Sequence, residues 1–269
     1  MKLRNDPYQT FRFSKTPAGL YARQKWLGDV QSVQWKNDFQ ETVDVLLTDQ
    51  SPDGSWHQDT AATLKHLFGL HLTVRSSNAQ IEAALTWLLK HIEIQTNKVQ
   101  INAKDVATVS DLTDLPFVSG RVDMLLTAAI LFLCSIFNRK NDPDVLAVYR
   151  WLSAHGIKNK GMWFDRASSH NILRAMVVHP VFAKDKATAL AVKYYADLQT
   201  DDGAWGDDLS FYQTLNALAH LDWPQAETQL EKAFERLWQT QNHDGTWSET
   251  DPEWNTFLAV HALKNKGLL

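Results

Sequence analysis

Apolar residues recur at intervals of three and four positions along most of the chain, a pattern typical of helices with one buried face. Residues 38–48 show it clearly, because Phe39, Val43 and Leu46 form one stripe. We find no alternation of the kind that predicts a strand. The sequence therefore predicts an all-α protein. The expected helices are 18–30, 38–48, 59–70, 79–92, 121–137, 142–155, 168–178, 184–198, 209–221, 225–239 and 252–265.

Three of the polar stretches between these helices repeat the phrase Q-x-x-D-G-x-W. They are residues 50–56, 199–205 and 241–247. Trp205 and Trp247 lie 42 residues apart, and Trp163, in a shorter Gly-Met-Trp version, lies 42 residues before Trp205. A period of this length is typical of stacked supersecondary units that share one core. Each unit reads as helix, tight turn and helix, which makes five helical hairpins.

The repeated phrase has a structural interpretation. Asp-Gly allows a sharp reversal, because glycine accepts the left-handed conformation that often ends a helix. The tryptophan can pack over the turn and against the next hairpin, and the glutamine amide can cap backbone groups. We therefore interpret the tryptophans first as packing residues.

Two segments depart from the repeat. Residues 93–119 replace the tight turn of the second hairpin with an irregular stretch, and a loop of that length in a compact domain is usually functional or mobile. Residues 1–35 are rich in arginine, lysine and aromatic residues and predict an N-terminal capping segment. Residues 36–269 then form a single helical domain.

Charge and composition exclude several classes of protein. The formal net charge is −4 with both signs interleaved, which argues against a nucleic-acid partner. No stretch approaches 18 consecutive apolar residues, so we expect no membrane span. The N-terminus resembles no signal peptide, which favours the cytoplasm. Cys134 is the one cysteine, so no internal disulfide forms, and its apolar surroundings indicate a core side chain.

Q-x-x-D-G-x-W between two helices resembles the QW repeat of squalene–hopene and oxidosqualene cyclases, and it is similar to the repeats of protein prenyltransferase β subunits. The resemblance covers roughly residues 36–265. It implies an α/α toroid of about five helical hairpins, with outer and inner helices around a central apolar cavity. In those families the cavity holds squalene or an isoprenoid diphosphate. The partner it implies is an isoprenoid-like apolar small molecule.

The catalytic signatures of those families are missing. Hopene-type cyclases use an Asp-x-Asp-Asp run, and the nearest clusters here are Asp201-Asp202 and Asp207-Asp208. No DDxxD motif follows either pair, and Cys134 lacks the Asp-x-Cys context of the prenyltransferase zinc site. We therefore transfer no catalytic residue by motif and expect neither a cofactor nor a metal ion. His66, His220 and His261 lie at similar depth in three inner helices, but no acid to orient them is evident, which favours core packing over zinc.

In a toroid the inner helices begin at one mouth of the cavity, so acids near those starts are candidate general acids. They are Asp59, Asp123, Asp165 and Asp208. Two interpretations stay open. Each acid can be a helix cap favoured by the helix dipole, or several acids brought together can raise the pKa of one of them to a value suited to proton donation.

Aligning the repeats on their tryptophans predicts the ligand-binding residues. An aromatic ring stands seven positions after three tryptophans, and an amide stands eight positions after. The rings are His170, Tyr212 and Trp254, and the amides are Asn171, Gln213 and Asn255. The remaining members of the predicted ligand-binding set lie beside these positions or beside the acids: Arg121, Arg166 and Phe211.

Three functions fit these residues. The first is a terpenoid-cyclase-like or prenyltransferase-like protein that encloses an apolar ligand and carries out acid-initiated cyclisation or prenyl transfer. The second is a non-catalytic scaffold or lipid-binding module, which the missing signatures favour. The third is a polysaccharide lyase or hydrolase, since toroids also host sugar chemistry, with Asp165 beside His170 or Tyr212 as the catalytic pair.

Overall fold

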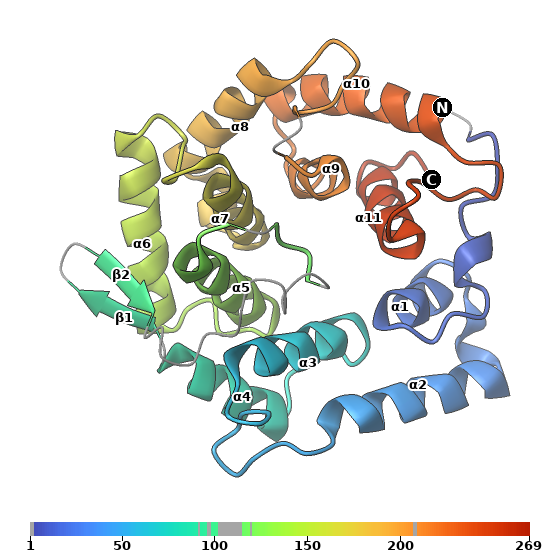
Figure 1. The fold of residues 1–269 in the computed structure, drawn as a ribbon, viewed down its shortest axis with the longest axis horizontal. Coiled ribbons are helices and arrows are strands. Elements are labelled where there is room, and N and C mark those ends of the chain that lie inside the picture. Colours follow the sequence, from blue (N-terminus) through green and yellow to red (C-terminus); the bar gives the residue numbers. More distant parts are fainter. Residues whose placement is uncertain (1–2, 91, 96–97, 102–114, 119, 207–208) are drawn as a thin grey trace. The chain divides into compact units, whose positions relative to one another are not determined.

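The computed structural model describes residues 3–90, 92–95, 98–101, 115–118, 120–206 and 209–269. Its described part contains eleven α-helices, labelled in Figure 1. They are α1 (Pro17–Lys25), α2 (Val33–Leu47), α3 (Thr60–Leu72), α4 (Ala79–Leu89), α5 (Val122–Ile136), α6 (Pro143–Lys158), α7 (Arg166–Val178), α8 (Lys186–Leu198), α9 (Phe211–Leu218), α10 (Pro224–Thr240) and α11 (Pro252–Asn265). Each predicted helix is present. Short 3₁₀ turns occupy Gln9–Phe11, Asp29–Gln31 and Phe182–Lys184.

One prediction was wrong. Strands β1 (Ile92–Gln95) and β2 (Lys98–Ile101) form an antiparallel hairpin at the start of the segment expected to be irregular. Its register pairs Ile92 with Ile101 and Ile94 with Val99. Each strand has only four residues, and their short alternation of apolar and polar residues was overlooked. The other residues of that segment up to 114 lie outside the described residues.

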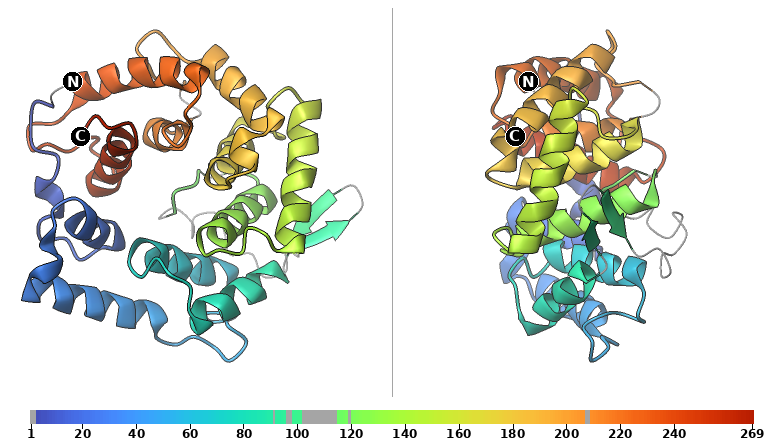
Figure 2. Two further views of the ribbon diagram at one scale, coloured as in Figure 1. Left: turned by 180° about the vertical axis from the view of Figure 1, so that it is seen from behind. Right: turned by 90° about the vertical axis from the view of Figure 1, so that its left-hand side faces the viewer.

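The chain forms two compact units. The first unit comprises Met1–Val45 and Tyr195–Leu269, and the second comprises Leu46–Tyr194. Within the second unit α5 packs along α7 and also contacts α3, α4 and α6. The left view in Figure 2 shows the β1–β2 hairpin at the edge of this unit, near α6. Within the first unit α11 packs against α9 and α1, so the two ends of the chain share one core.

The tryptophans of the repeated turns are core residues. All four are at most 1% exposed: Trp56, Trp163, Trp205 and Trp247. Each indole N–H donates a hydrogen bond to a neighbouring segment. Three bonds go to backbone oxygens of Thr48 (2.8 Å), Leu152 (2.7 Å) and Leu237 (2.8 Å), and the fourth goes to the side chain of Gln229 (3.0 Å). The packing interpretation of these residues is therefore confirmed.

The turn glycines are required for two reasons. Gly54 and Gly203 adopt φ values of +96° and +87°. A Cβ atom on either would lie 2.5 Å from a backbone oxygen of the next outer helix, that of Ala83 or of Lys232. Glycine is the residue that accepts this conformation without strain, and it also allows the close approach.

The glutamine of the turn links consecutive hairpins. The amide nitrogen of Gln50 donates to the carbonyl of Gly54 (2.9 Å) and to that of Gln80 (2.8 Å), which lies in the next outer helix. Gln199 makes the same pair of bonds, the second of them to Gln229 (2.8 Å). Each turn is thereby closed on itself and fixed to the hairpin that follows.

At the last turn the start of the chain takes the place of the following hairpin. The amide nitrogen of Gln241 donates to the carbonyl of Asn5 (3.1 Å), and its oxygen accepts from the backbone N–H groups of Arg4 (3.1 Å) and Asn5 (3.0 Å). Residues near the N-terminus therefore cover the final turn of the first unit. This contact agrees with a capping role for the N-terminal segment, although the predicted boundary at residue 35 stays a prediction.

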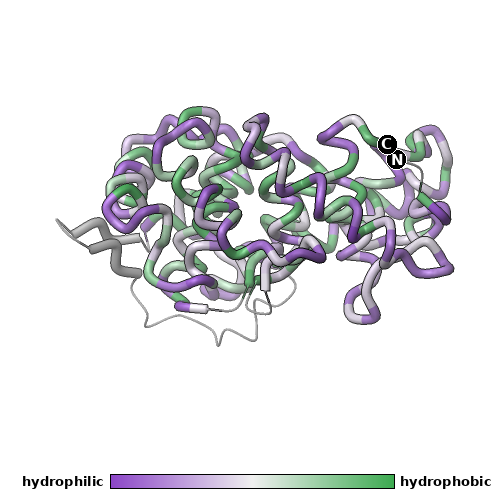
Figure 3. Tube along the Cα trace, turned by 90° about the horizontal axis from the view of Figure 1, so that it is seen from above, coloured by the Kyte–Doolittle hydropathy of each residue, from purple (hydrophilic) through white to green (hydrophobic). Residues whose placement is uncertain are grey.

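Hydrophobic and hydrophilic residues alternate along the described chain. Figure 3 shows hydrophobic and hydrophilic residues mixed along the tube, without a long uniformly hydrophobic stretch. Among the residues described, no helix combines the length and the apolar character needed to cross a bilayer. Cys134 is buried as predicted, and burial raises the pKa of its thiol to about 12.

Candidate functional site

Two of the predicted acids cap helices in the second unit. Asp59 precedes α3, and its side chain accepts a hydrogen bond from the backbone N–H of Ala62 (2.6 Å). Asp165 precedes α7 and accepts from the N–H of Ser168 (2.7 Å) in the same way. These contacts stabilise the helix starts and match the capping interpretation. Another of the four predicted acids, Asp208, lies outside the described residues.

Arg121 joins the starts of α5 and α7. Its guanidinium forms two hydrogen bonds with Asp123, at 3.1 Å and 2.6 Å, and lies 4.6 Å from the centre of the Phe164 ring. The bonds to Asp123 raise the pKa of Arg121, and the charge of Asp165 acts in the same direction. The structure thus brings Arg121 together with Asp123 and the Phe164 ring. Arg166 begins α7 with an exposed side chain.

Phe164 continues a stack of flat side chains on the second unit. Its ring lies 4.4 Å from that of His155 and 6.1 Å from that of Trp151, both on α6 and close to parallel with it. Phe164 has a φ of +62°, which is unusual for a bulky residue. The turn without Asp-Gly therefore builds a cation–aromatic stack. The pair on α6 was not predicted, although its spacing of four places both rings on one helix face.

Asn171 fixes the segment before α5. Its side-chain oxygen accepts from the backbone N–H of Val118 (2.9 Å), and its amide nitrogen donates to the carbonyl of the same residue (2.9 Å). Both ends of the amide are therefore engaged with the backbone. The described segment 115–118 is held against α7 by this residue, 53 positions away in sequence.

That segment brings Phe117 into an aromatic layer inside the second unit. Phe117 lies 5.5 Å from Phe68 of α3 and 6.0 Å from Phe132 of α5, edge-on to both. Phe68 and Phe132 stack on each other at 5.4 Å. The guanidinium of Arg174 lies 5.7 Å from the centre of the Phe132 ring. Sequence reasoning missed this layer, because no repeat spacing links its four members.

His170 is buried beside this layer, on the same helix as Arg174. It is 1% exposed, and neither ring nitrogen makes a hydrogen bond with the described residues. The pKa of His170 is lowered to about 4, chiefly by burial and in addition by the charge of Arg174, while Asn171 acts in the opposite direction. Burial also lowers the pKa of Arg174, to about 10. At neutral pH the histidine is therefore neutral and the arginine is charged.

The first unit has its own aromatic layer, between α1 and α11. Phe257 stacks on Trp254 at 5.3 Å and on Trp26 at 5.2 Å, and Tyr21 meets it edge-on at 5.4 Å. His261 stacks on the same ring at 5.9 Å. Of these residues, Trp254 alone belonged to the predicted ligand-binding set, and His261 was expected to pack in the core. Phe257 and His261 follow it at helical spacing and so lie on the same side of α11.

The other predicted residues of the first unit lie on α9 and α11. Tyr212 contacts Phe211 edge-on at 5.1 Å, and burial raises the pKa of Tyr212. The side-chain oxygen of Gln213 and the indole N–H of Trp254 are buried without a hydrogen-bond partner among the described residues. Asn255 instead donates to the carbonyl of Thr250 (2.8 Å), a contact local to the start of its helix.

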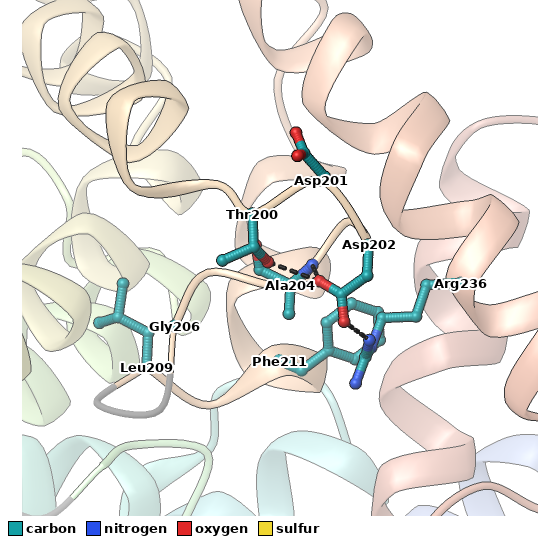
Figure 4. A pocket seen from close by; sticks show the side chains of 8 residues that line it. All are labelled: Thr200, Asp201, Asp202, Ala204, Gly206, Leu209, Phe211 and Arg236. Carbon is teal, nitrogen blue, oxygen red and sulfur yellow. Dashed lines mark hydrogen bonds and ion pairs between the residues drawn. The ribbon is translucent and has the colours of Figure 1, made fainter.

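A pocket of about 570 Å³ opens at the turn formed by residues 199–205, also in the first unit (Figure 4). Asp202 occupies its middle, where one carboxylate oxygen accepts from the Thr200 hydroxyl (2.5 Å) and the other is paired with Arg236 of α10. Arg236 lies 5.5 Å from the ring centre of Phe211, the predicted ligand-binding residue that lines this pocket. Asp201 points away from the ion pair in Figure 4.

This ion pair distinguishes the turn at residues 199–205 from those at residues 50–56 and 241–247. In those turns the aspartate accepts from the hydroxyl two residues on, Ser55 or Thr246, at 2.7 Å. That oxygen also accepts from the backbone N–H of the same residue, as one oxygen of Asp202 does from the N–H of Ala204 (3.3 Å). What sets Asp202 apart is that its other oxygen is paired with Arg236.

No metal site is evident in the part of the chain that the structure describes, where no three histidine, cysteine, aspartate or glutamate side chains are grouped for one ion. His66 stacks on Trp56 at 4.6 Å and contacts the carbonyl of Leu46 (2.7 Å). In the first unit the rings of His220 and His261 are 5.6 Å apart. His66 thus has the core-packed environment that was favoured.

Comparison with known proteins places the fold. No protein-family model and no curated protein sequence matches the chain. A crystal structure of a protein from Actinoplanes is similar to it, with a TM-score of 0.61 at 18% identity, covering 98% of this chain and 90% of that one. The type II terpene cyclase MstE from Scytonema is similar with a TM-score of 0.60 at 14% identity, covering 98% and 90%.

An MstE variant in complex with geranylgeranyl dihydroxybenzoate, its substrate, has a TM-score of 0.60 at 14% identity, with 98% and 89% of the two chains covered. Because these likenesses extend over nearly the whole of each chain, they concern the complete fold rather than one hairpin. They confirm the predicted fold class: the protein has the all-α, α/α toroid fold of the terpene cyclases.

Proposed function

We propose that the protein is terpenoid-cyclase-like in function as well as in fold, and that it binds an isoprenoid or another apolar small molecule. The fold shared with MstE supports this proposal, since that enzyme is found with geranylgeranyl dihydroxybenzoate, its substrate, and with merosterolic acid A, its product. The Q-x-x-D-G-x-W turns are then the counterparts of QW repeats. The cytoplasm remains the predicted location.

The observation that carries the proposal is that aromatic side chains cluster on the helices that follow the turns. Each unit lines these helices with aromatic rings, Phe68 and Phe132 in one and Trp254 and Phe257 in the other. Aromatic faces offer a large apolar contact area and attract cations, including a developing carbocation. Buried polar atoms without hydrogen-bond partners lie on the same helices, as in His170, and an internal polar group of this kind calls for a partner.

The reaction that fits such a surface is acid-initiated cyclisation or prenyl transfer. In cyclisation a carboxylic acid donates its proton to a carbon–carbon double bond, the cation closes onto further double bonds, and loss of a proton ends the reaction. Asp59, Asp123, Asp165 and Asp208 are the proposed donors. Arg121, Arg166, Asn171, Tyr212, Gln213 and Asn255 complete the proposed ligand-binding set, with His170, Phe211 and Trp254.

A second candidate is a binding module without catalysis. The contacts of the three described acids favour it, because Asp59 and Asp165 cap helices and Asp123 is paired with Arg121. In this arrangement all three carboxylates act as hydrogen-bond acceptors. Binding and turnover must therefore be measured separately.

The test is calorimetric titration with geranylgeraniol and squalene, followed by product analysis after incubation with squalene and C10 to C20 prenyl diphosphates. We expect saturable binding of at least one isoprenoid. Asp→Asn variants at the four positions then separate the candidates, since loss of product in one variant with binding retained identifies an enzyme. Binding without turnover identifies the module, and the absence of any isoprenoid binding rejects both.

A further inference from the structure

Two buried polar atoms of the first unit are complementary, and neither has a hydrogen-bond partner among the described residues. The side-chain oxygen of Gln213, on α9, is an acceptor, and the indole N–H of Trp254, on α11, is a donor. A buried polar group left unpaired costs free energy. Such groups therefore find partners in the protein, in water or in a ligand.

The hydrogen bonds between α9 and α11 define how these two helices lie against each other. They are neighbours within the first unit (Figure 1). Three contacts join a residue in or just after α9 to the residue 45 positions later: Asn216 with His261 (3.2 Å), His220 with Asn265 (3.5 Å) and Leu221 with Lys266 (2.5 Å). Because the offset is constant, the two helices run parallel, with these residues along the line of contact.

This register places Gln213 and Trp254 on the same line of contact. Gln213 precedes Asn216 by three positions and Trp254 precedes His261 by seven, spacings that keep a side chain on one face of a helix. The offset makes Gln213 level with Leu258. Trp254 therefore lies one helical turn, on the order of 6 Å, closer to the helix starts. The donor and the acceptor are thus on facing sides of α9 and α11.

A hydroxyl group is the chemical match for this pair. Its oxygen accepts a hydrogen bond from an N–H group while its proton is donated to an amide oxygen. A carboxylate or an ether oxygen accepts but does not donate, so it would leave the Gln213 oxygen unpaired. A hydrocarbon would leave both atoms unpaired, at the cost of two buried polar groups.

An aromatic stack lies beside the pair. Trp254 stacks on Phe257 at 5.3 Å, and Phe257 stacks on Trp26, the residue after α1, at 5.2 Å. The stack fixes the plane of the indole that carries the N–H group. An indole face also offers a large apolar contact area. A hydrocarbon chain that continues from a hydroxyl at this N–H group therefore meets an aromatic surface.

We infer that Gln213 and Trp254 bind a hydroxyl group of an isoprenoid ligand, whose hydrocarbon chain contacts the Trp254 ring. The inference rests on the proposed function and names its ligand class. It selects isoprenoid alcohols over bare hydrocarbons such as squalene. It also gives the two residues distinct roles, with Gln213 accepting the hydroxyl proton and Trp254 donating to the hydroxyl oxygen.

The experiment compares three probes that share one hydrocarbon chain, titrated into the full-length protein by calorimetry. They are geranylgeraniol, its methyl ether, and the hydrocarbon in which hydrogen replaces the hydroxyl group. The affinity of the alcohol relative to the ether reports the bond to Gln213, and that of the ether relative to the hydrocarbon reports the bond from Trp254. Because the hydration of each probe is the same in every experiment, a change in either ratio between protein variants reports on the site.

Variants assign each ratio to one residue. Gln213→Leu should lower the alcohol-to-ether ratio about tenfold, and Trp254→Phe should lower the ether-to-hydrocarbon ratio by a similar factor, the size of one hydrogen bond to a buried group. Gln213→Glu keeps an acceptor oxygen and should retain the first ratio, which covers the case in which Gln213→Leu does not fold. The matched controls, Gln225→Leu and Trp238→Phe, replace exposed side chains of α10 and should leave both ratios unchanged.

A spectroscopic readout tests Trp254 in the natural protein. Its indole N–H resonance should move downfield on addition of geranylgeraniol or the ether, and not on addition of the hydrocarbon. If both ratios are unchanged in the variants, or if the resonance is the same with all three probes, bound water supplies the partner and the inference is overturned, while the proposed function stands. If no isoprenoid binds at all, the proposed function is rejected, and the inference with it.

Discussion

The repeated turns of this protein keep the same contacts in each copy, whereas the side chains at the helix starts that follow them differ. At the turns the same atoms do the same work in each copy: a glycine with positive φ lies against the next backbone segment, and a buried tryptophan donates its N–H to a neighbour. Seven residues after the tryptophan, the side chain changes from His170 to Tyr212 to Trp254. Repetition therefore marks the contacts that stack hairpins, and we propose that variation within the repeated frame marks the positions that contact a ligand.

The comparison also explains where polar groups remain without partners. The buried polar groups of the turns are satisfied, as in the two bonds of the Gln50 amide. On the following helices the rings of His170 and Trp254 keep buried nitrogens without hydrogen bonds among the described residues. A buried polar group without a hydrogen bond calls for an explanation, and under the proposed function a bound ligand supplies the partner.

The largest expected effect breaks a turn. Trp163→Ala removes a fully buried indole and its bond to Leu152, and it should lower the free energy of unfolding by about 3–5 kcal/mol. Chemical denaturation measures the loss. Trp238→Ala is the control, because Trp238 is 38% exposed and should cost far less. Equal losses in the two variants would contradict the packing role of the turn tryptophans.

The next effect concerns a helix start and depends on pH. The pKa of His170 is about 4 in the folded protein and about 6.5 in an unfolded chain. Between these values the unfolded chain binds a proton that the folded protein does not, so stability falls as the pH is lowered from about 6.5 to 4, by up to about 3 kcal/mol.

His170→Phe should therefore flatten the dependence of the unfolding free energy on pH over that range. The effect is compared with that of His243→Phe, which replaces an exposed histidine of the same chain. His66, His155 and His179 also have pKa values lowered by burial, and they contribute the same slope in every protein compared. If the pH dependence of the unfolding free energy in His170→Phe is the same as in the natural protein, the lowered pKa of His170 is contradicted.

Two glycines separate the energetic cost of the left-handed backbone conformation from the cost of a steric clash. Gly203 and Gly206 both have positive φ, but a Cβ atom would meet the Lys232 carbonyl at 2.5 Å in the first case and no atom of the described residues within 4 Å in the second. Gly206→Ala should cost about 1–2 kcal/mol, for the left-handed conformation alone. Gly203→Ala should cost clearly more in the same denaturation experiment. Similar costs would show that the close approach to α10 is easily relieved.

The smallest effect concerns a helix cap. Asp59→Ala should lower stability by about 1 kcal/mol, because the bond to the N–H of Ala62 is lost. Asp59→Asn should be nearly as stable as the natural protein, since asparagine is an equally good cap. Thermal melts compare the two variants. If both lose the same stability, the charge of Asp59 rather than its cap hydrogen bond is what matters.

The fold could be predicted because its information is local and periodic. A helix stripe and a seven-residue turn phrase are each read within one stretch of chain, and they gave the eleven helices. The β1–β2 hairpin was missed because four-residue strands carry little periodic signal. The candidate site depends instead on contacts between distant residues, such as Asn171 with Val118 and Asp202 with Arg236, which no spacing rule connects.

The same limit applies to the individual predicted residues. Alignment on the tryptophans located His170 and Trp254, whose buried nitrogens distinguish them from ordinary core residues. It also selected Asn171, whose side-chain amide forms two hydrogen bonds with the backbone of Val118. The difference between these outcomes lies in the partner that tertiary packing supplies, and the sequence of the helix alone does not contain it.

Photoaffinity labelling tests the central claim most directly. A geranylgeranyl probe with a diazirine at its end is irradiated with the protein, and the labelled peptides are identified by mass spectrometry. We predict adducts on α3, α5, α7, α9 or α11 that excess unlabelled isoprenoid prevents. Adducts confined to the turns and to the helices that precede them, or labelling that the competitor leaves unchanged, would contradict the account.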